Sequence, residues 1–212
     1  MNEKLRESVQ YLTNCNFIEN ETFRLYETLS KKINQPESSF ILGIAYDNLK
    51  NTKIVQGILD CLDPLELENK NVRKDLSELA AQITALNKKI SKINNLDYLI
   101  SCEILKESIN IEVLLTEVYT NYLKSSSPKI IVEELSENLV VNMNTFKKVI
   151  QDFIDEKGKH RETIVETMYL LEAKETEVHR QITPIIKYRN PDAWIRESTI
   201  HSFTSTPGNT QE

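Results

Sequence analysis

Apolar residues recur every three or four positions along most of this chain, with polar or charged residues between them. This spacing predicts amphipathic α-helices, and no segment has the alternating pattern of a β-strand. We expect breaks at Pro36, Pro64 and Pro128, because proline interrupts the helical hydrogen-bond ladder. The expected helices lie near residues 17–33, 40–62, 70–95, 98–124 and 138–172, with shorter ones near 3–13 and 175–188.

The helix expected at 70–95 has the most regular pattern in the chain. Its apolar residues are separated by four and three positions in turn: Val72, Leu76, Leu79, Ile83, Leu86, Ile90 and Ile93. Such a stripe is typical of a helix that buries one narrow seam. Two interpretations stay open. Either this helix crosses over the outside of its own bundle, or the stripe 72–93 contacts a second copy of the chain or another protein.

The composition favours one all-α domain. The chain has 212 residues, of which 40% are hydrophobic, and its four glycines and six prolines argue against a fold rich in strands and turns. We assign residues 1–189 to a single helical bundle domain. Residues 190–212 are polar and are expected to form a flexible tail. In that tail the only tryptophan, Trp194, could dock on the bundle or on a partner.

Charge and cysteine content narrow the function classes. A net charge of −6 without a clustered basic stripe disfavours binding to nucleic acid. No apolar run approaches the roughly 18–20 residues that a membrane span requires, so we expect a cytoplasmic protein without a membrane span. The three cysteines are far apart and odd in number, which argues against a disulfide framework or a zinc site.

A second pattern repeats between the two halves of the chain. In each half one helix carries a glutamate and, seven residues later, a tyrosine; these are Glu19 with Tyr26 and Glu112 with Tyr119. The next long helix carries an acid, a lysine three residues on, and then an amide or imidazole; these are Asp47, Lys50 and Asn51, and then Glu156, Lys159 and His160. Residues three apart share a helix face. The repeat therefore predicts two helical hairpins that direct acids into one interior. The two tyrosines either pack there with their hydroxyls bonded to core carboxylates or, in a working di-iron enzyme, are redox-active.

This repeat resembles the di-iron carboxylate signature of ferritin-like bundles, in which a Glu and an acid-x-x-His motif occur twice. The segment IENETFRLYETL looks like the first helix of rubrerythrin-type members, and FIDEKGKHRETI looks like their acid-x-x-His helix. The resemblance covers roughly residues 15–62 and 98–172. It implies a ferritin-like four-helix bundle with a long crossover helix at about 70–95 and a short C-terminal helix. By the same resemblance, the metal ligands would be Glu19, Asp47, Glu112, Glu156 and His160.

The chain departs from the family pattern at the histidine positions. When the acids are aligned, Lys50 and Lys159 stand where the family has histidines. If the alignment moves by one residue, Asn48 and Asn51 replace the first acid and histidine, while Lys157 replaces the second acid and His160 is retained. In either alignment the six-ligand set is incomplete, because a protonated lysine offers no lone pair and repels a cation.

Three interpretations follow for these residues. They form a core charge network without metal, with Glu19, Asp47, Glu112 and Glu156 converging around Lys50 and Lys159; or they hold an atypical metal site; or they are surface charges. The first predicts a non-catalytic structural or interaction protein without a cofactor. The second predicts a metal-dependent oxidoreductase or an iron-handling protein that uses iron or manganese, with His160 as the nitrogen ligand. Whether the protein is an enzyme stays open on these grounds.

Overall fold

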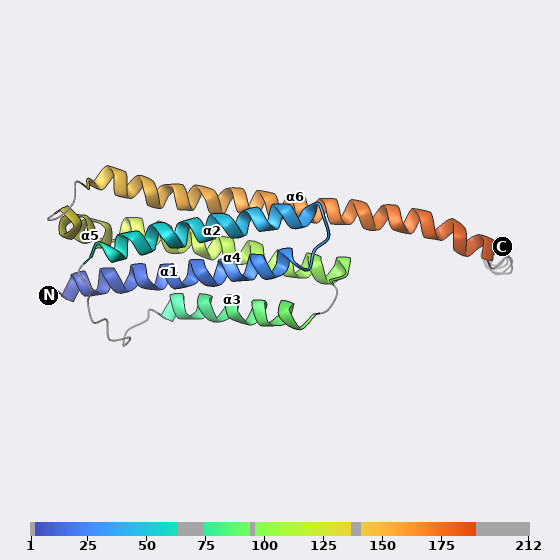
Figure 1. Cartoon of the computed structure of the whole chain (residues 1–212), viewed down its shortest axis with the longest axis horizontal. Helices are drawn as coiled ribbons and strands as arrows, with labels where there is room; N and C mark the ends of the chain where they lie inside the picture. Colours follow the sequence, from blue (N-terminus) through green and yellow to red (C-terminus); the bar gives the residue numbers. More distant parts are fainter. Residues whose placement is uncertain (1–2, 63–73, 94–95, 137–140, 190–212) are drawn as a thin grey trace, which may run out of the picture. The chain divides into compact units, whose positions relative to one another are not determined.

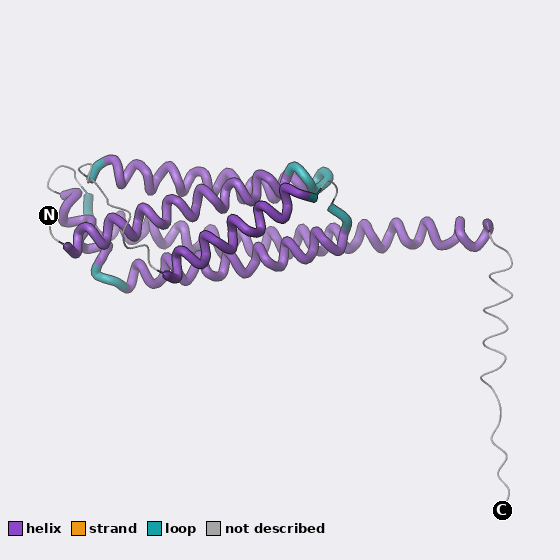
Figure 2. The backbone as a smooth tube through the Cα atoms, turned by 90° about the horizontal axis from the view of Figure 1, so that it is seen from below, coloured by secondary structure: helices purple, strands orange, loops and turns teal. Residues whose placement is uncertain are grey.

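The computed structural model describes residues 3–62, 74–93, 96–136 and 141–189, and these residues are almost entirely helical (Figure 2). The helices are α1 (Glu3–Ser30), α2 (Glu37–Asp60), α3 (Lys74–Lys92), α4 (Tyr98–Lys124), α5 (Ser127–Ser136) and α6 (Met143–Arg189). The described residues contain no β-strand, which confirms the all-α prediction.

The helix boundaries differ from the predicted ones in three places. The short leading helix and the helix predicted at 17–33 are one helix, α1, because no glycine or proline lies between Glu3 and Ser30. The helix predicted at 138–172 begins at Met143 as α6 and is preceded by a separate short helix, α5; Asn142 Oδ1 caps the start of α6 by accepting a hydrogen bond from the Thr145 amide at 2.9 Å. The short helix predicted at 175–188 is the last part of α6, which continues past Pro184.

Contacts divide the chain into two compact units, residues 1–169 and residues 170–212. In the first unit, α1, α2, α4 and the first part of α6 lie side by side (Figure 1). Helices α1 and α6 run in one direction, and α2 and α4 run in the other. The parallel direction of α2 and α4 follows from the crossover, because α3 returns the chain to the end at which α2 began.

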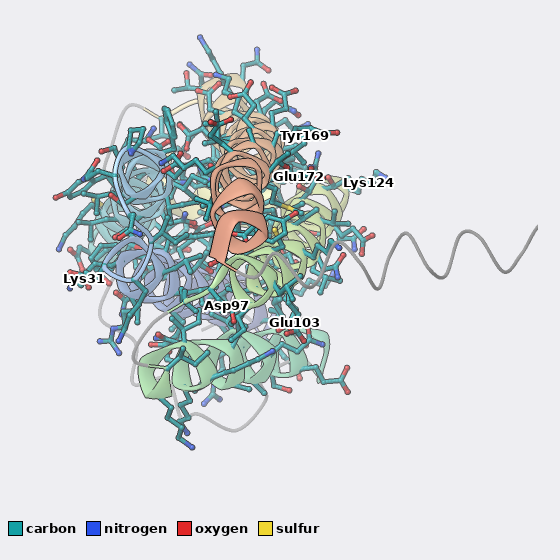
Figure 3. All side chains as sticks on the ribbon, turned by 90° about the vertical axis from the view of Figure 1, so that its right-hand side faces the viewer. Lys31, Asp97, Glu103, Lys124, Tyr169 and Glu172 are labelled. Atoms are coloured by element: carbon teal, nitrogen blue, oxygen red, sulfur yellow. The ribbon has the colours of Figure 1, made fainter. Side chains whose placement is uncertain are left out.

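Helix α3 lies on the outside of the first unit, against α1 and α4 (Figure 3). Its stripe is buried within the chain itself at Leu76, Leu79, Ile83, Leu86 and Ile90. On its flank, Lys89 pairs with Glu103, which Figure 3 labels, at 3.4 Å. At these five positions the stripe packs against the chain's own helices, as the crossover interpretation expects, and a contact of the stripe 72–93 with a second copy or another protein stays a prediction. Val72 lies outside the described residues.

Replacing Leu79 with lysine is expected to unfold the chain more readily without changing its mass in solution. Leu79 is 3% exposed, so Leu79→Lys removes a buried side chain and buries a charge, which lowers the free energy of unfolding by about 3 kcal/mol or more. Urea denaturation followed by circular dichroism measures the loss, and sedimentation equilibrium measures the mass. Ala81→Lys, on the exposed face of α3, is the control. A halved mass with an unchanged urea midpoint would show that the seam joins two chains.

None of the described helices is long and apolar enough to cross a membrane. The predicted tail, residues 190–212, lies outside the described residues, and so does Trp194.

Candidate functional site

Two fully buried glutamates, one on α1 and one on α4, lie at the centre of the first unit. Each accepts a hydrogen bond from a tyrosine on the other helix. The Tyr119 hydroxyl donates to Glu19 Oε1 at 2.8 Å, and the Tyr26 hydroxyl donates to Glu112 Oε1 at 2.7 Å. The equal seven-residue spacing explains this reciprocity, because on antiparallel helices it places each tyrosine beside the glutamate of the other helix. The predicted bonding of both hydroxyls to core carboxylates is confirmed.

The two tyrosines remain neutral hydrogen-bond donors. Burial, followed by the charge of Glu112, raises the pKa of Tyr26 well above its ordinary value. Burial and the charge of Glu19 do the same to the pKa of Tyr119. Both phenols therefore stay protonated and donate hydrogen bonds to the carboxylates.

Lys157 of α6 occupies the same interior and is fully buried. Its Nζ donates to Glu19 Oε2 at 2.9 Å and to Asn48 Oδ1 at 2.6 Å. The Asn48 amide is oriented by its own bond, from Nδ2 to the Ile44 carbonyl at 2.7 Å. Burial alone would lower the pKa of Lys157, but the charges of Glu19 and Glu112 outweigh it and the pKa is raised. The lysine is therefore an ammonium ion held between α1 and α2.

His160 lies one helical turn further along α6 and is 3% exposed. Its Nδ1 is 3.4 Å from Glu112 Oε2, and its Nε2 is 3.3 Å from Asp47 Oδ2. A neutral imidazole would turn one nitrogen lone pair toward a carboxylate oxygen, whereas a doubly protonated ring donates to both. The ring therefore bridges two carboxylates, and which of its nitrogens donates depends on the tautomer. Since the Asp47 side chain is 49% exposed, His160 links the buried Glu112 to solvent.

The charge of Glu112 depends on its cationic neighbours. Burial raises the pKa of this carboxyl group, but the charge of Lys157 and the hydrogen bonds from His160 and Tyr26 outweigh burial, so the pKa is lowered from its ordinary value of 4.5. A carboxyl group whose pKa is lower in the folded chain contributes stability above its unfolded pKa. That contribution is lost as the pH falls through the folded pKa.

We expect the stability difference between the native chain and a Glu112→Gln variant to narrow below about pH 4.5, since protonation removes the same charge that the substitution removes. Near neutral pH the variant should be the less stable of the two. Urea denaturation at a series of pH values measures the difference. Glu103→Gln is the control, because the Glu103 side chain is 62% exposed; its stability difference from the native chain should change little with pH. A constant gap for Glu112→Gln across the series would contradict the lowered pKa.

The inward faces of α2 and α6 follow one spacing of three and four residues. On α2 the buried positions are Ile41, Ile44, Asn48, Asn51 and Val55, and on α6 they are Ile150, Phe153, Lys157, His160 and Ile164. Asn48 and Asn51 on α2, and Lys157 and His160 on α6, therefore occupy positions at which the three-and-four spacing would otherwise place apolar residues. Asn51 is fully buried, and neither its Oδ1 nor its Nδ2 has a hydrogen-bond partner.

The structure corrects the predicted placement of the charges on these two helices. The prediction that Lys50 and Lys159 lie in the interior is wrong, because the Lys50 side chain is 51% exposed and Lys159 is exposed. Lys50 instead pairs with Glu156 at the surface between α2 and α6, and Asp47 is half-exposed. Adjacent residues lie about 100° apart around a helix. The residues that face the interior are therefore those of the alignment moved by one residue, namely Asn48, Asn51, Lys157 and His160.

A signal for this register was present in the sequence. Ile44 and Val55 are spaced four residues from Asn48 and Asn51, and Phe153 and Ile164 are spaced in the same way from Lys157 and His160. The apolar pattern therefore identifies the inward polar positions. The acid-first alignment missed Lys157 because it matched residue types and did not follow the apolar periodicity.

These residues do not fit a di-metal centre. Both oxygens of Glu19 already accept bonds, from Tyr119 and Lys157, and both oxygens of Glu112 have partners in Tyr26 and His160. An ammonium ion at the centre repels a cation and offers no lone pair. Within the described ranges, no group of three or more His, Cys, Asp or Glu residues is placed to hold a metal ion.

Comparisons with protein-family models, with curated proteins and with solved structures found no match to this chain.

Proposed function

We propose that this chain is a ferritin-like four-helix bundle in which a buried charge network around Lys157 replaces the di-metal site, and that it is a non-catalytic structural or interaction protein. The single observation that carries the proposal is the buried ammonium group of Lys157, bonded to Glu19 and Asn48. In this reading, the ammonium group occupies a position at which the family has a metal-binding carboxylate.

The order of the buried polar residues supports the ferritin-like part of the proposal. The family pattern is Glu, then Glu-x-x-His, and then both again. The buried residues here are Glu19, then Asn48 with Asn51, then Glu112, then Lys157 with His160, and the spacing within each pair is three. The two single glutamates and one histidine keep the family residue type. The other three positions carry residues that bind metal poorly or not at all.

The charge balance supports the non-catalytic part. A conventional site presents four carboxylates to two divalent ions. Here the two buried carboxylates, Glu19 and Glu112, are accompanied by the buried ammonium group of Lys157, which pairs with Glu19, and by the His160 ring beside Glu112, so the interior already holds a cation of its own. Buried ions that are paired and hydrogen-bonded in this way are stable without an added cation. The network then has the role of fixing how four helices pack, which suits a scaffold or interaction protein.

Metal analysis tests the proposal directly. Chain purified without chelators should contain no stoichiometric iron, manganese or zinc, and adding Fe²⁺, Mn²⁺ or Zn²⁺ should leave the melting temperature unchanged. Any ion that bound the folded chain tightly would raise that temperature by mass action. Elemental analysis and calorimetry provide the two measurements. A tightly bound ion in stoichiometric amount would contradict the proposal and favour the metal-dependent oxidoreductase, with His160 as the nitrogen ligand.

A further inference from the structure

The side-chain amide of Asn51 lies in the interior without hydrogen bonds. Asn51 is fully buried, and neither its Oδ1 nor its Nδ2 has a partner among the described residues. An amide group provides two donors and one acceptor, and a buried polar group that stays unbonded loses its hydration without compensation. Almost all buried polar groups of native proteins are therefore bonded, either to protein or to ordered water. Asn51 requires such a partner.

Two nearby groups have bonding capacity that matches this amide. Lys157 Nζ carries three protons, and within the described ranges it donates two bonds, to Glu19 and to Asn48. Glu156 Oε1 pairs with Lys50, whereas Glu156 Oε2 is buried and has no partner in the described part of the chain. One donor thus remains at Lys157 and one acceptor at Glu156.

Helical register places these groups along one short stretch of the seam between α2 and α6, which lie side by side in opposite directions (Figure 1). Asn51 lies one turn along α2 from Asn48, which contacts Lys157. It also directly follows Lys50, which pairs with Glu156. Residues on neighbouring turns of a helix have Cβ atoms about 5–6 Å apart. A water molecule with partners about 2.8 Å away on two sides spans that distance.

We propose that Asn51 is the centre of an internal water site in the seam between α2 and α6. One water accepts a hydrogen bond from the third proton of Lys157 and donates to Asn51 Oδ1. A second water accepts from Asn51 Nδ2 and donates to Glu156 Oε2. Each of these groups is then bonded, and the two waters connect the buried ammonium group to the ion pair at the surface.

The occupant is water because the site does not suit a metal ion. The ammonium group of Lys157 repels a cation and offers it no lone pair. Within the described ranges, no three His, Cys, Asp or Glu residues are placed to hold a metal ion. The site instead combines donors with acceptors, and a water molecule bonds to both kinds of group.

A groove on the same seam gives water a route to the site. Its volume is about 270 Å³, and it is lined by Lys50 and Ile54 of α2 and by Phe153 and Glu156 of α6. Because Glu156 lines the groove, the second water lies next to it, and the interior network exchanges water and protons with solvent through the seam. The inference goes beyond the proposed function and uses no likeness to ferritin-like proteins, so its failure would leave that proposal in place.

NMR of the native chain labelled with ¹⁵N tests the site directly. The side-chain amide protons of Asn51 should show dipolar transfer from water with the sign of a long-lived contact, and a rotating-frame experiment separates this transfer from chemical exchange. The side-chain amide of Asn121, an exposed residue, is the control and should show only the transfer that is typical of brief surface hydration. Absence of long-lived water contact at Asn51 would overturn the proposal.

A matched pair of variants, Asn51→Leu and Asn121→Leu, tests the same site by loss. Water relaxation dispersion, which detects long-lived internal water, should show the loss of at least one such molecule in Asn51→Leu and no loss in Asn121→Leu. The urea midpoint of Asn51→Leu should not rise, because the native amide is already bonded through water. An unchanged amount of internal water, or a raised urea midpoint, would show that the native amide is dry. If Asn51→Leu does not fold by circular dichroism, the measurement on the native chain decides.

Discussion

Replacing Lys157 with methionine is expected to lower the free energy of unfolding by about 3–5 kcal/mol, because Glu19 would be left as a buried carboxylate without a cation. Methionine fills a similar volume, so the change isolates the charge from the packing. The Lys157 and Glu19 side chains are both fully buried, and Lys157 Nζ lies 2.9 Å from Glu19 Oε2. Urea denaturation near neutral pH, followed by circular dichroism, measures the loss.

Two companion variants make this result specific. Lys159→Met removes an exposed lysine two residues from Lys157. Because Lys159 is exposed, the change should alter the free energy of unfolding by no more than about 0.5 kcal/mol. Glu19→Gln combined with Lys157→Met removes both charges and should be more stable than Lys157→Met alone, which a double-mutant cycle quantifies. If Lys157→Met unfolds at the same urea concentration as the native chain, the ammonium group does not lie in the interior.

Restoring the family ligands at the inward positions is expected to create a metal site. The triple variant Asn48→Glu/Asn51→His/Lys157→Glu would join Glu19, Glu112 and His160 in a set of four carboxylates and two imidazoles, the donors that di-metal bundles use. Without metal it should be much less stable, since four buried carboxylates repel one another. Metal should restore stability, by about 2.7 kcal/mol at a concentration roughly 100-fold above the dissociation constant.

The control for this experiment uses the outer register of the same two helices. Lys50→His/Lys159→His completes two acid-x-x-His motifs, with Asp47 and Glu156, on positions that face solvent or lie near it. We expect it to bind no pair of ions tightly, although by sequence it matches the family motif better. Calorimetric titration with Mn²⁺ compares the two variants. Tight binding by the outer-register variant alone would show that the assigned faces of α2 and α6 are reversed, and binding by neither would count against the ferritin-like geometry.

The sequence was sufficient for the helical class and for most helix positions. The apolar spacing, together with the scarcity of glycine, identified α2, α3 and α4 to within a few residues. It was less informative about where one helix ends and the next begins. A separate short helix was predicted at 175–188, whereas α6 continues through these residues and past Pro184, because one proline removes only one backbone hydrogen bond. The α3 stripe likewise predicted a buried seam, but not that α1 and α4 cover it.

At the candidate site, the sequence by itself determined that Glu19 and Glu112 each have a tyrosine seven residues on, and that spacing led directly to the crossed tyrosine–carboxylate bonds. Only the tertiary structure decided between the neighbours Asp47 and Asn48 on α2, and between Glu156 and Lys157 on α6. Adjacent residues on a helix point about 100° apart, and a lysine side chain is long enough to reach either water or the interior. Which one turns inward depends on the helix packed opposite. Against α6, Asn48 supplies the oxygen that satisfies the buried ammonium group of Lys157.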